Sequence, residues 1–108
     1  PKKQLATYKR IATRAGKVWK DHGALEYVEC VADDVKKGKL TSFPQSVKLK
    51  AGEVVIFSYV VYKSRAHRDR VMAKVMKDPR LADLMHPDSM PFDGARMFWG
   101  GFKPIVSL

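Results

Sequence analysis

The sequence VVIFSYVVY, residues 54–62, decides the architecture of this chain. Every position except Ser58 carries a β-branched or aromatic side chain, which is typical of a β-strand. Side chains alternate between the two faces of a strand, and here both faces are apolar. A strand of this kind must be covered on both sides. Because one small layer of helices covers only one side, we expect another structure to cover the second.

Two elements are predicted on the N-terminal side of this strand. Over residues 4–22, apolar side chains recur at three- and four-residue steps, which predicts an amphipathic helix. Residues 24–32 alternate as a strand does, with Tyr27 and Glu29 on the same face. Residues 33–52 show no clear period, and we expect one short irregular or extended piece that covers a sheet edge.

The C-terminal half carries clear helix signals. Ser64 is placed as the N-cap of a helix over residues 65–77. Asp78 and Pro79 then end this helix and begin another turn, as N-cap and first position. Residues 95–102 are predicted to form a last strand. The order is helix, strand, strand, helix, strand, and one strand before the first helix would complete the ferredoxin-like β-α-β-β-α-β arrangement of an α+β fold with an antiparallel sheet.

The composition favours one domain over residues 1–108. The chain has 21 Lys plus Arg against 11 Asp plus Glu, and its net charge is +10. The single cysteine, Cys30, excludes a disulfide scaffold and a cysteine-rich zinc site, and we expect its thiol to be a small buried apolar group. No apolar run is long enough to span a bilayer, and the start shows no secretory signal. We therefore expect a soluble, intracellular protein with no membrane partner.

Three groups of residues together resemble a known family, the YbaA-like family of small bacterial proteins of unknown function. The resemblance extends over residues 1–106. The stretches that carry it are HGALEYVEC (22–30) with the acidic pair 33–34, VIFSY (55–59) with residues 68–69 and 78–80, and MPFDG (90–94) with residues 96–97 and GGF (100–102).

The resemblance implies a dimeric α+β barrel in the bacterial cytoplasm. In such a barrel two ferredoxin-like sheets face each other, so a second copy would cover the exposed face of strand 54–62. Relatives begin with a strand before the first helix, so either such a strand precedes Pro1 or this sheet lacks it. We expect the former, because loss of a central strand would expose the ladder of its neighbours. The family has no agreed reaction. The resemblance therefore names no catalytic residue and no cofactor, and it does not decide whether the protein is an enzyme.

Four polar residues are candidates for binding a small organic ligand: Arg96, Asp93, Ser58 and Glu29. Asp93 and Gly94 form a turn in which Gly94 can take a positive φ. Arg96 either binds an anionic ligand at the mouth of a cavity or pairs with Asp93 to fix this turn. Glu29 would be costly in a dry interior, so it is either paired at the surface or a polar group inside a cavity.

The basic residues suggest a different function, the binding of RNA or another polyanion. The candidates lie on the first helix and within residues 36–50, and they are Arg10, Arg14, Lys17, Lys37 and Lys39. The sequence shows no nucleic-acid-binding motif, and dispersed solvated charge is the simpler account.

A metal site is the last candidate weighed. His22 and Glu26 flank a tight turn, but no third ligand is evident, so we expect no metal.

Overall fold

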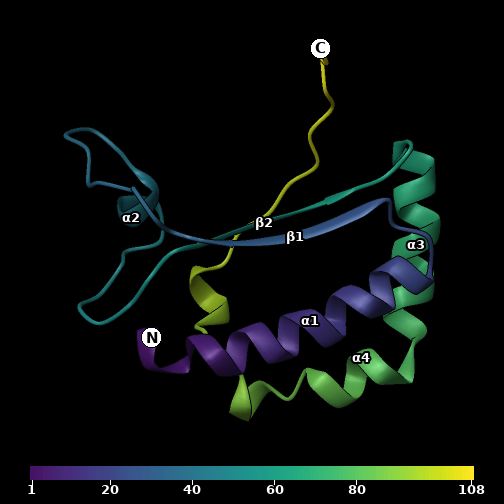
Figure 1. Ribbon diagram of the computed structural model, residues 1–108, viewed down its shortest axis with the longest axis horizontal. Coiled ribbons are helices and arrows are strands. Elements are labelled where there is room, and N and C mark those ends of the chain that lie inside the picture. The colour runs from purple at the N-terminus through teal and green to yellow at the C-terminus, as the bar shows by residue number, and fades with distance from the viewer.

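Two antiparallel strands and a layer of helices make up this structure, and the predicted α+β class is confirmed. The computed structural model describes residues 1–108, apart from the side chain of Pro87. Helices α1, α3 and α4 lie on one side of the sheet, while the short α2 lies beyond one end of it (Figure 1). The elements in chain order are η1 (Lys2–Gln4), α1 (Leu5–Asp21), β1 (Glu26–Val31), α2 (Phe43–Ser46), β2 (Ile56–Val61), α3 (Arg65–Lys77), α4 (Pro79–Leu84), η2 (Pro87–Ser89) and η3 (Gly94–Arg96).

One face of the sheet packs on the helices. Strands β1 and β2 pair with Tyr27 opposite Val60 and Glu29 opposite Ser58. The ring of Tyr27 lies against Gly16 of α1, so these four strand residues share the helix-facing side. The first helix and the two central strands therefore lie where the sequence places them, with slightly shorter bounds.

The other face of the sheet is open, and we call it the open face. Its cross-strand pairs include Cys30 with Phe57 and Val28 with Tyr59. Among the residues that the structure describes, no helix covers this face, and Phe57 and Tyr59 are 55% and 43% exposed. The thiol of Cys30 is only partly buried for the same reason, which corrects the expectation of a fully buried cysteine. The two apolar faces of strand 54–62 are confirmed, and one chain covers only one of them.

The core lies where α1, α3 and α4 meet the end of the sheet. Its most completely buried side chains are Val18, Val71 and Val75. Trp19 of α1 packs against this core and donates its indole N–H to the hydroxyl of Tyr62, at 3.1 Å. This hydrogen bond joins the first helix to the end of β2.

The helix caps agree with the sequence prediction. The hydroxyl of Ser64 accepts the N–H of His67 at 3.1 Å, and helix α3 begins at the next residue. The carboxylate of Asp78 accepts the N–H of Arg80 at 2.9 Å, and Pro79 is the first residue of α4.

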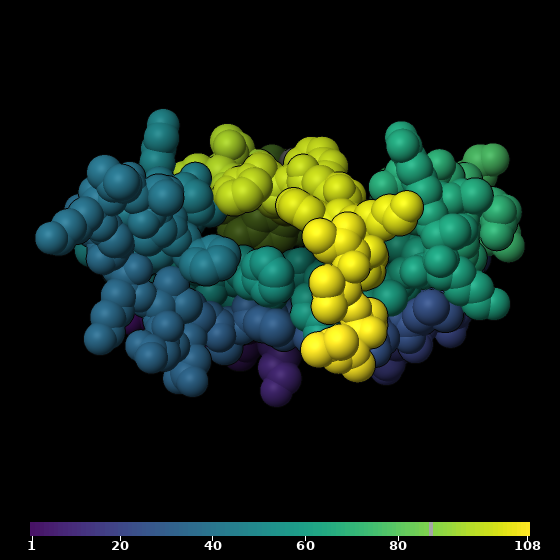
Figure 2. Space-filling model, turned by 90° about the horizontal axis from the view of Figure 1, so that it is seen from above, coloured from purple at the N-terminus to yellow at the C-terminus, as the bar shows by residue number. Residues whose placement is uncertain are grey.

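The predicted last strand, residues 95–102, is wrong for this structure. Residues 94–96 form the short helix η3, and the following residues are extended without a strand partner in the described chain. A strand exists only through hydrogen bonds to a neighbour. Figure 2, which looks down on the open face, shows a recess between the unpaired edge of β2 and the C-terminal residues. Residues 95–102 have the apolar pattern of a strand, but no neighbouring strand in the described chain pairs with them.

Two smaller expectations also need correction. Residues 33–52 contain a short helix, α2, whose N-cap Ser42 accepts the N–H of Gln45. The weak apolar period of this region hid that signal. Gly94 does not take the positive φ that the sequence allowed. The turn there is completed by the carboxylate of Asp93, which accepts the N–H of Ala95.

Candidate functional site

A half-buried carboxylate lies between the sheet and helix α1. The side chain of Glu29, in the middle of β1, accepts two phenolic hydrogen bonds. The hydroxyl of Tyr8 donates to one oxygen at 2.8 Å, and the hydroxyl of Tyr27 donates to the other at 2.9 Å. Ser58 lies directly opposite in β2 and is exposed. We call Tyr8, Tyr27 and Glu29 the Glu29 cluster.

The two phenols of the cluster stay protonated over the whole neutral range. Burial raises the pKa of Tyr8 well above its ordinary value of 10.0, and its hydrogen bond to Glu29 raises it further. Burial, followed by the negative charge of Glu29, raises the pKa of Tyr27 in the same direction. Both groups are therefore permanent donors to Glu29. A carboxylate has about four acceptor positions, so a ligand can still donate to it.

Aromatic rings surround this carboxylate. Phe92 packs edge-on against Tyr8, with ring centroids 5.9 Å apart. On the other side, Tyr27 packs against Trp19 at 5.7 Å. The cluster thus combines one polar acceptor with apolar walls, which is the composition common to small-molecule sites.

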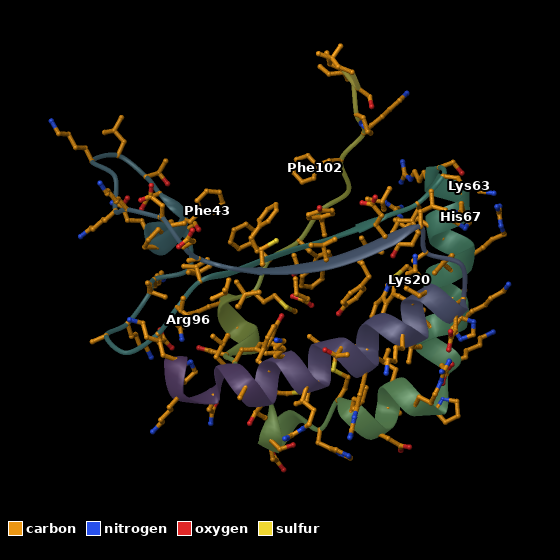
Figure 3. All side chains as sticks on the ribbon, in the orientation of Figure 1. Lys20, Phe43, Lys63, His67, Arg96 and Phe102 are labelled. Carbon is orange, nitrogen blue, oxygen red and sulfur yellow. The ribbon has the colours of Figure 1, made fainter. Side chains whose placement is uncertain are left out.

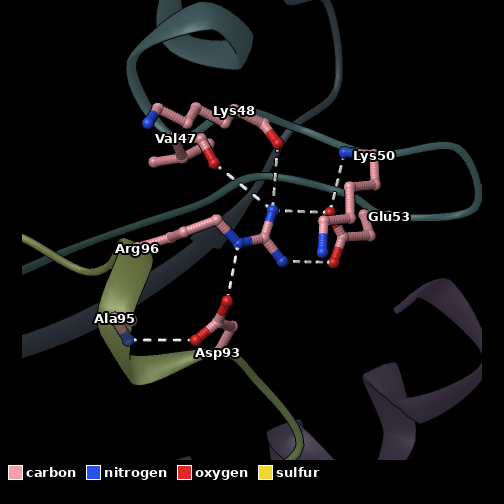
Figure 4. Close-up of polar contacts among 7 residues, drawn as sticks. All are labelled: Val47, Lys48, Lys50, Glu53, Asp93, Ala95 and Arg96. Atoms are coloured by element: carbon pink, nitrogen blue, oxygen red, sulfur yellow. Dashed lines mark hydrogen bonds and ion pairs between the residues drawn. The ribbon is translucent and has the colours of Figure 1, made fainter.

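Arg96 follows Phe92 by one turn of chain and is held by groups outside the cluster, which we call the Arg96 clamp (Figure 4). Its Nε donates to Asp93 at 2.9 Å, and its terminal nitrogens donate to the two carboxylate oxygens of Glu53 at 2.6 and 2.8 Å. One of these nitrogens also donates to the carbonyls of Val47 and Lys48, at 3.3 and 3.1 Å. The clamp joins three separate segments of the chain.

The charges of the clamp stabilise one another. The hydrogen bonds from Arg96 lower the pKa of Glu53 from 4.5 to about 2, with a further contribution from the N–H of Lys50. The hydrogen bond from Arg96 also lowers the pKa of Asp93, with a further contribution from the N–H of Ala95. The contact between Asp93 and Arg96 that fixes the turn is present. An anionic ligand would have to compete with both carboxylates for this guanidinium.

The structure places the four predicted ligand residues in two neighbouring pairs. Glu29 and Ser58 face each other across the strands, and Asp93 and Arg96 lie in the clamp. Phe92 connects the pairs, because it precedes Asp93 and packs on Tyr8. Their binding of a ligand stays a prediction. The two tyrosines were missed, although Tyr27 shares a predicted strand face with Glu29 and Tyr8 lies on the apolar side of the predicted helix.

Two hollows lie elsewhere on the surface. One of about 550 Å³ lies beside the N-terminus and is lined by residues 1–3 and 50–53. The other, of about 250 Å³, lies on the open face and is lined by Cys30, Phe43, Val55, Phe57 and residues 31–35. Neither of these two hollows includes Glu29 or Ser58.

The candidate polyanion-binding residues do not form one surface. Arg10, Arg14 and Lys17 are exposed on α1. Lys37 and Lys39 belong to the loop before α2, which projects beyond the far end of the sheet (Figure 1). The structure therefore separates the two basic regions that the sequence placed in one candidate site.

His22 has a charged partner that the sequence did not reveal. Its Nε2 lies 2.8 Å from a carboxylate oxygen of Asp78, and Arg80 bridges Asp78 and Asp21. These contacts fasten the end of α1 to the start of α4. Within the described residues, no group of three or more His, Cys, Asp or Glu side chains could hold a metal ion.

The fold and the cluster define an α+β protein with a half-buried carboxylate between its sheet and its first helix. No helix in the described part of the chain is long and apolar enough to cross a membrane. The family model described as "Protein of unknown function (DUF1428)" matches residues 1–94, and the chain belongs to this family.

Bacterial relatives match over nearly the whole chain. They include the "Uncharacterized protein YbaA" of Escherichia coli K12 and that of Shigella flexneri. Each is 42% identical over 106 residues, which is 98% of this chain and 89% of the relative. The resemblance inferred from the sequence motifs is thereby confirmed.

Proposed function

We propose that this protein is a cytoplasmic homodimer that binds a small organic ligand between the sheet and helix α1. The observation that carries the proposal is the Glu29 cluster, a half-buried carboxylate fixed by two phenols and faced by the exposed Ser58. The ligand would approach from the recess beside β2 (Figure 2). Asp93 and Arg96 hold the chain that carries Phe92, and so they shape the site from one side.

The chemistry of the cluster selects a class of ligand. Glu29 accepts hydrogen bonds, so the ligand must offer an ammonium, amide N–H or hydroxyl donor. Ser58 can either donate or accept a second hydrogen bond. The rings of Tyr8, Tyr27 and Phe92 fit an aromatic or aliphatic body beside that donor. We therefore expect a small amphipathic molecule with at least one donor group.

A ligand screen on wild-type protein and one matched pair of variants tests this site. Native mass spectrometry against a library of small amines, alcohols and amides should yield a hit whose Kd rises at least 10-fold in Glu29→Gln. Glu26→Gln is the control, because Glu26 lies on the same strand but points to the opposite face. The site would be refuted if both variants lost affinity equally, or if neither variant lost affinity for any hit.

The homodimer is supported by the open face. Phe57 and Tyr59 are exposed there, and the ring of Phe57 lies edge-on to Phe43 and tilted against Tyr59, so the three rings form a continuous aromatic surface. A contiguous apolar surface of this kind marks an interface more often than free surface. Light scattering should give twice the mass of one chain. Phe57→Lys should shift it toward one chain, while Leu40→Lys, in an exposed loop, should not.

A second candidate function rests on the basic face of α1. Lys9, Arg10, Arg14 and Lys17 are exposed, and in the described chain no carboxylate pairs with them. Four unpaired cations on one helix can follow the phosphates of a single-stranded RNA.

Salt dependence tests this second function. With four phosphate contacts, the Kd for a labelled single-stranded RNA should rise about 50-fold between 50 and 200 mM salt. Arg14→Glu with Lys17→Glu should abolish binding, and Lys37→Glu with Lys39→Glu should leave it nearly unchanged, because the latter pair lies at the far end of the molecule. No binding at 50 mM salt would exclude the function.

A further inference from the structure

The last twelve residues form an apolar arm that no other part of the described chain covers. We call residues 97–108 the C-terminal arm. Trp99, Phe102 and Ile105 are 84%, 96% and 93% exposed. Apart from Met97, whose N–H donates to Gly94, no residue of the arm makes a hydrogen bond to the described chain. Large apolar side chains presented together in this way indicate a contact surface.

The small hollow on the open face is complementary to this arm. Its walls are apolar, with Phe43 packed edge-on against Phe57 at 6.3 Å and the thiol of Cys30 beside them. Its rim is acidic, because Asp33 and Asp34 also line it. The arm carries the basic Lys103 between Phe102 and Ile105. An apolar hollow with an acidic rim thus matches an apolar segment with a basic residue in its middle.

The arm and the hollow lie on the same side of the sheet, with the hollow at the α2 end and the arm nearer the α3 end. Figure 3 shows Phe43 and Phe102 on the side away from the helices. The hollow lies at the α2 end of the sheet, whereas Gly101 passes Arg68 near the start of α3. In Figure 1 the arm then leads away from the body rather than back toward α2. This path points to a hollow on another molecule.

We propose that two copies exchange arms, so that the arm of each copy lies in the open-face hollow of the other. In such a dimer the two open faces meet, and the two-fold axis runs parallel to the sheets and perpendicular to their strands. This axis places the α3 end of one sheet over the α2 end of its partner. Lys103 then meets Asp33 and Asp34 of the partner chain. The exchange rests on the homodimer proposed above, and it assigns the segment and the surface that hold the dimer together.

Cys30 makes this proposal directly testable, because the single cysteine of the chain lines the hollow. Cysteine is introduced into the arm at one position at a time, as Trp99→Cys, Phe102→Cys or Ile105→Cys, followed by mild oxidation. At least one variant should form a dimer that dithiothreitol separates, with a disulfide between Cys30 and the arm identified by peptide mass spectrometry. A disulfide requires the two Cα atoms to approach within about 7 Å.

Two controls separate this linkage from random oxidation. Each arm variant combined with Cys30→Ser should lose the mapped disulfide. Thr13→Cys, on the exposed part of α1 across the sheet from the hollow, should form none with Cys30 under the same conditions.

The outcomes distinguish the arm exchange from the homodimer itself. If light scattering gives a dimer but no arm position links to Cys30, the exchange is wrong and the homodimer stands. If the disulfide forms within one chain, the arm folds back on its own hollow, and the exchange is also wrong. A single-chain mass at all concentrations refutes both. Deletion of residues 102–108 should raise the dimer Kd at least 10-fold, and an unchanged Kd would contradict the exchange.

Discussion

Helix α1 crosses the sheet at Gly16, and the substitution Gly16→Ala tests how tightly they pack. A Cβ at this position would lie 2.7 and 2.9 Å from two carbons of the Tyr27 ring. The ring cannot move freely, because Trp19 packs on it and its hydroxyl is bonded to Glu29. Alanine in place of glycine should by itself favour the helix by about 1 kcal/mol. Overpacking costs roughly 1–3 kcal/mol, and loss of the hydrogen bond adds about 1 kcal/mol. We therefore expect a net loss of about 2 kcal/mol.

Urea unfolding monitored by circular dichroism measures this loss as a lower midpoint with an unchanged slope. Gly94→Ala is the control, because a Cβ there meets nothing within 4 Å and the change should be nearly neutral. In a Tyr27→Ala background the clash is gone, and Gly16→Ala should stabilise the protein by about 1 kcal/mol. The reasoning is refuted if Gly16→Ala stabilises the wild-type chain, or destabilises both backgrounds equally.

Three further predictions concern the core, the clamp and a cap. Val75→Ala should lower the free energy of unfolding by about 2–3 kcal/mol in urea titrations, because Val75 is completely buried, while Met76→Ala at the exposed neighbouring position should cost under 1 kcal/mol. The pKa of Glu53 is lower in the folded chain, so the stability that its ionised form contributes is present above pH 4.5 and lost as the pH falls toward 2. Glu53→Gln should flatten this part of the curve of unfolding free energy against pH. A curve identical to that of the wild type would contradict the clamp. Ser64→Ala should cost about 1 kcal/mol in thermal unfolding, whereas Ser64→Asp, which keeps the cap, should cost little; equal losses would argue against capping.

The elements with purely local signals were predictable from the sequence. Helix α3 begins at Arg65 and ends at Lys77 as expected, because Ser64 caps its start and Pro79 prevents its continuation beyond Asp78. The strand over residues 54–62 was predictable from its β-branched and aromatic residues alone. The last strand was not predictable in the same way, because a strand depends on a neighbouring backbone that its own residues do not specify.

The candidate site was predictable only in part, because its contacts join residues that are distant in the sequence. Tyr8 and Glu29 are 21 residues apart, and Arg96 lies 43 residues from Glu53. The sequence indicates that Glu29 is unusual, since it is a charged residue within a strand. It does not indicate which helix position lies over it, because that depends on how α1 crosses the sheet at Gly16.

The chemistry of position 29 separates a ligand site from a purely structural cluster. A glutamine there could accept a hydrogen bond from one phenol and donate to the oxygen of the other, since both tyrosines can donate or accept. Half-burying an amide also costs less than half-burying a charge. A structural role alone therefore does not require a carboxylate. Glu29→Gln should leave the free energy of unfolding within about 1 kcal/mol of the wild-type value while raising the ligand Kd at least 10-fold. If the substitution instead unfolds the protein, Glu29 serves to join the sheet to α1, and the proposed site loses its main support.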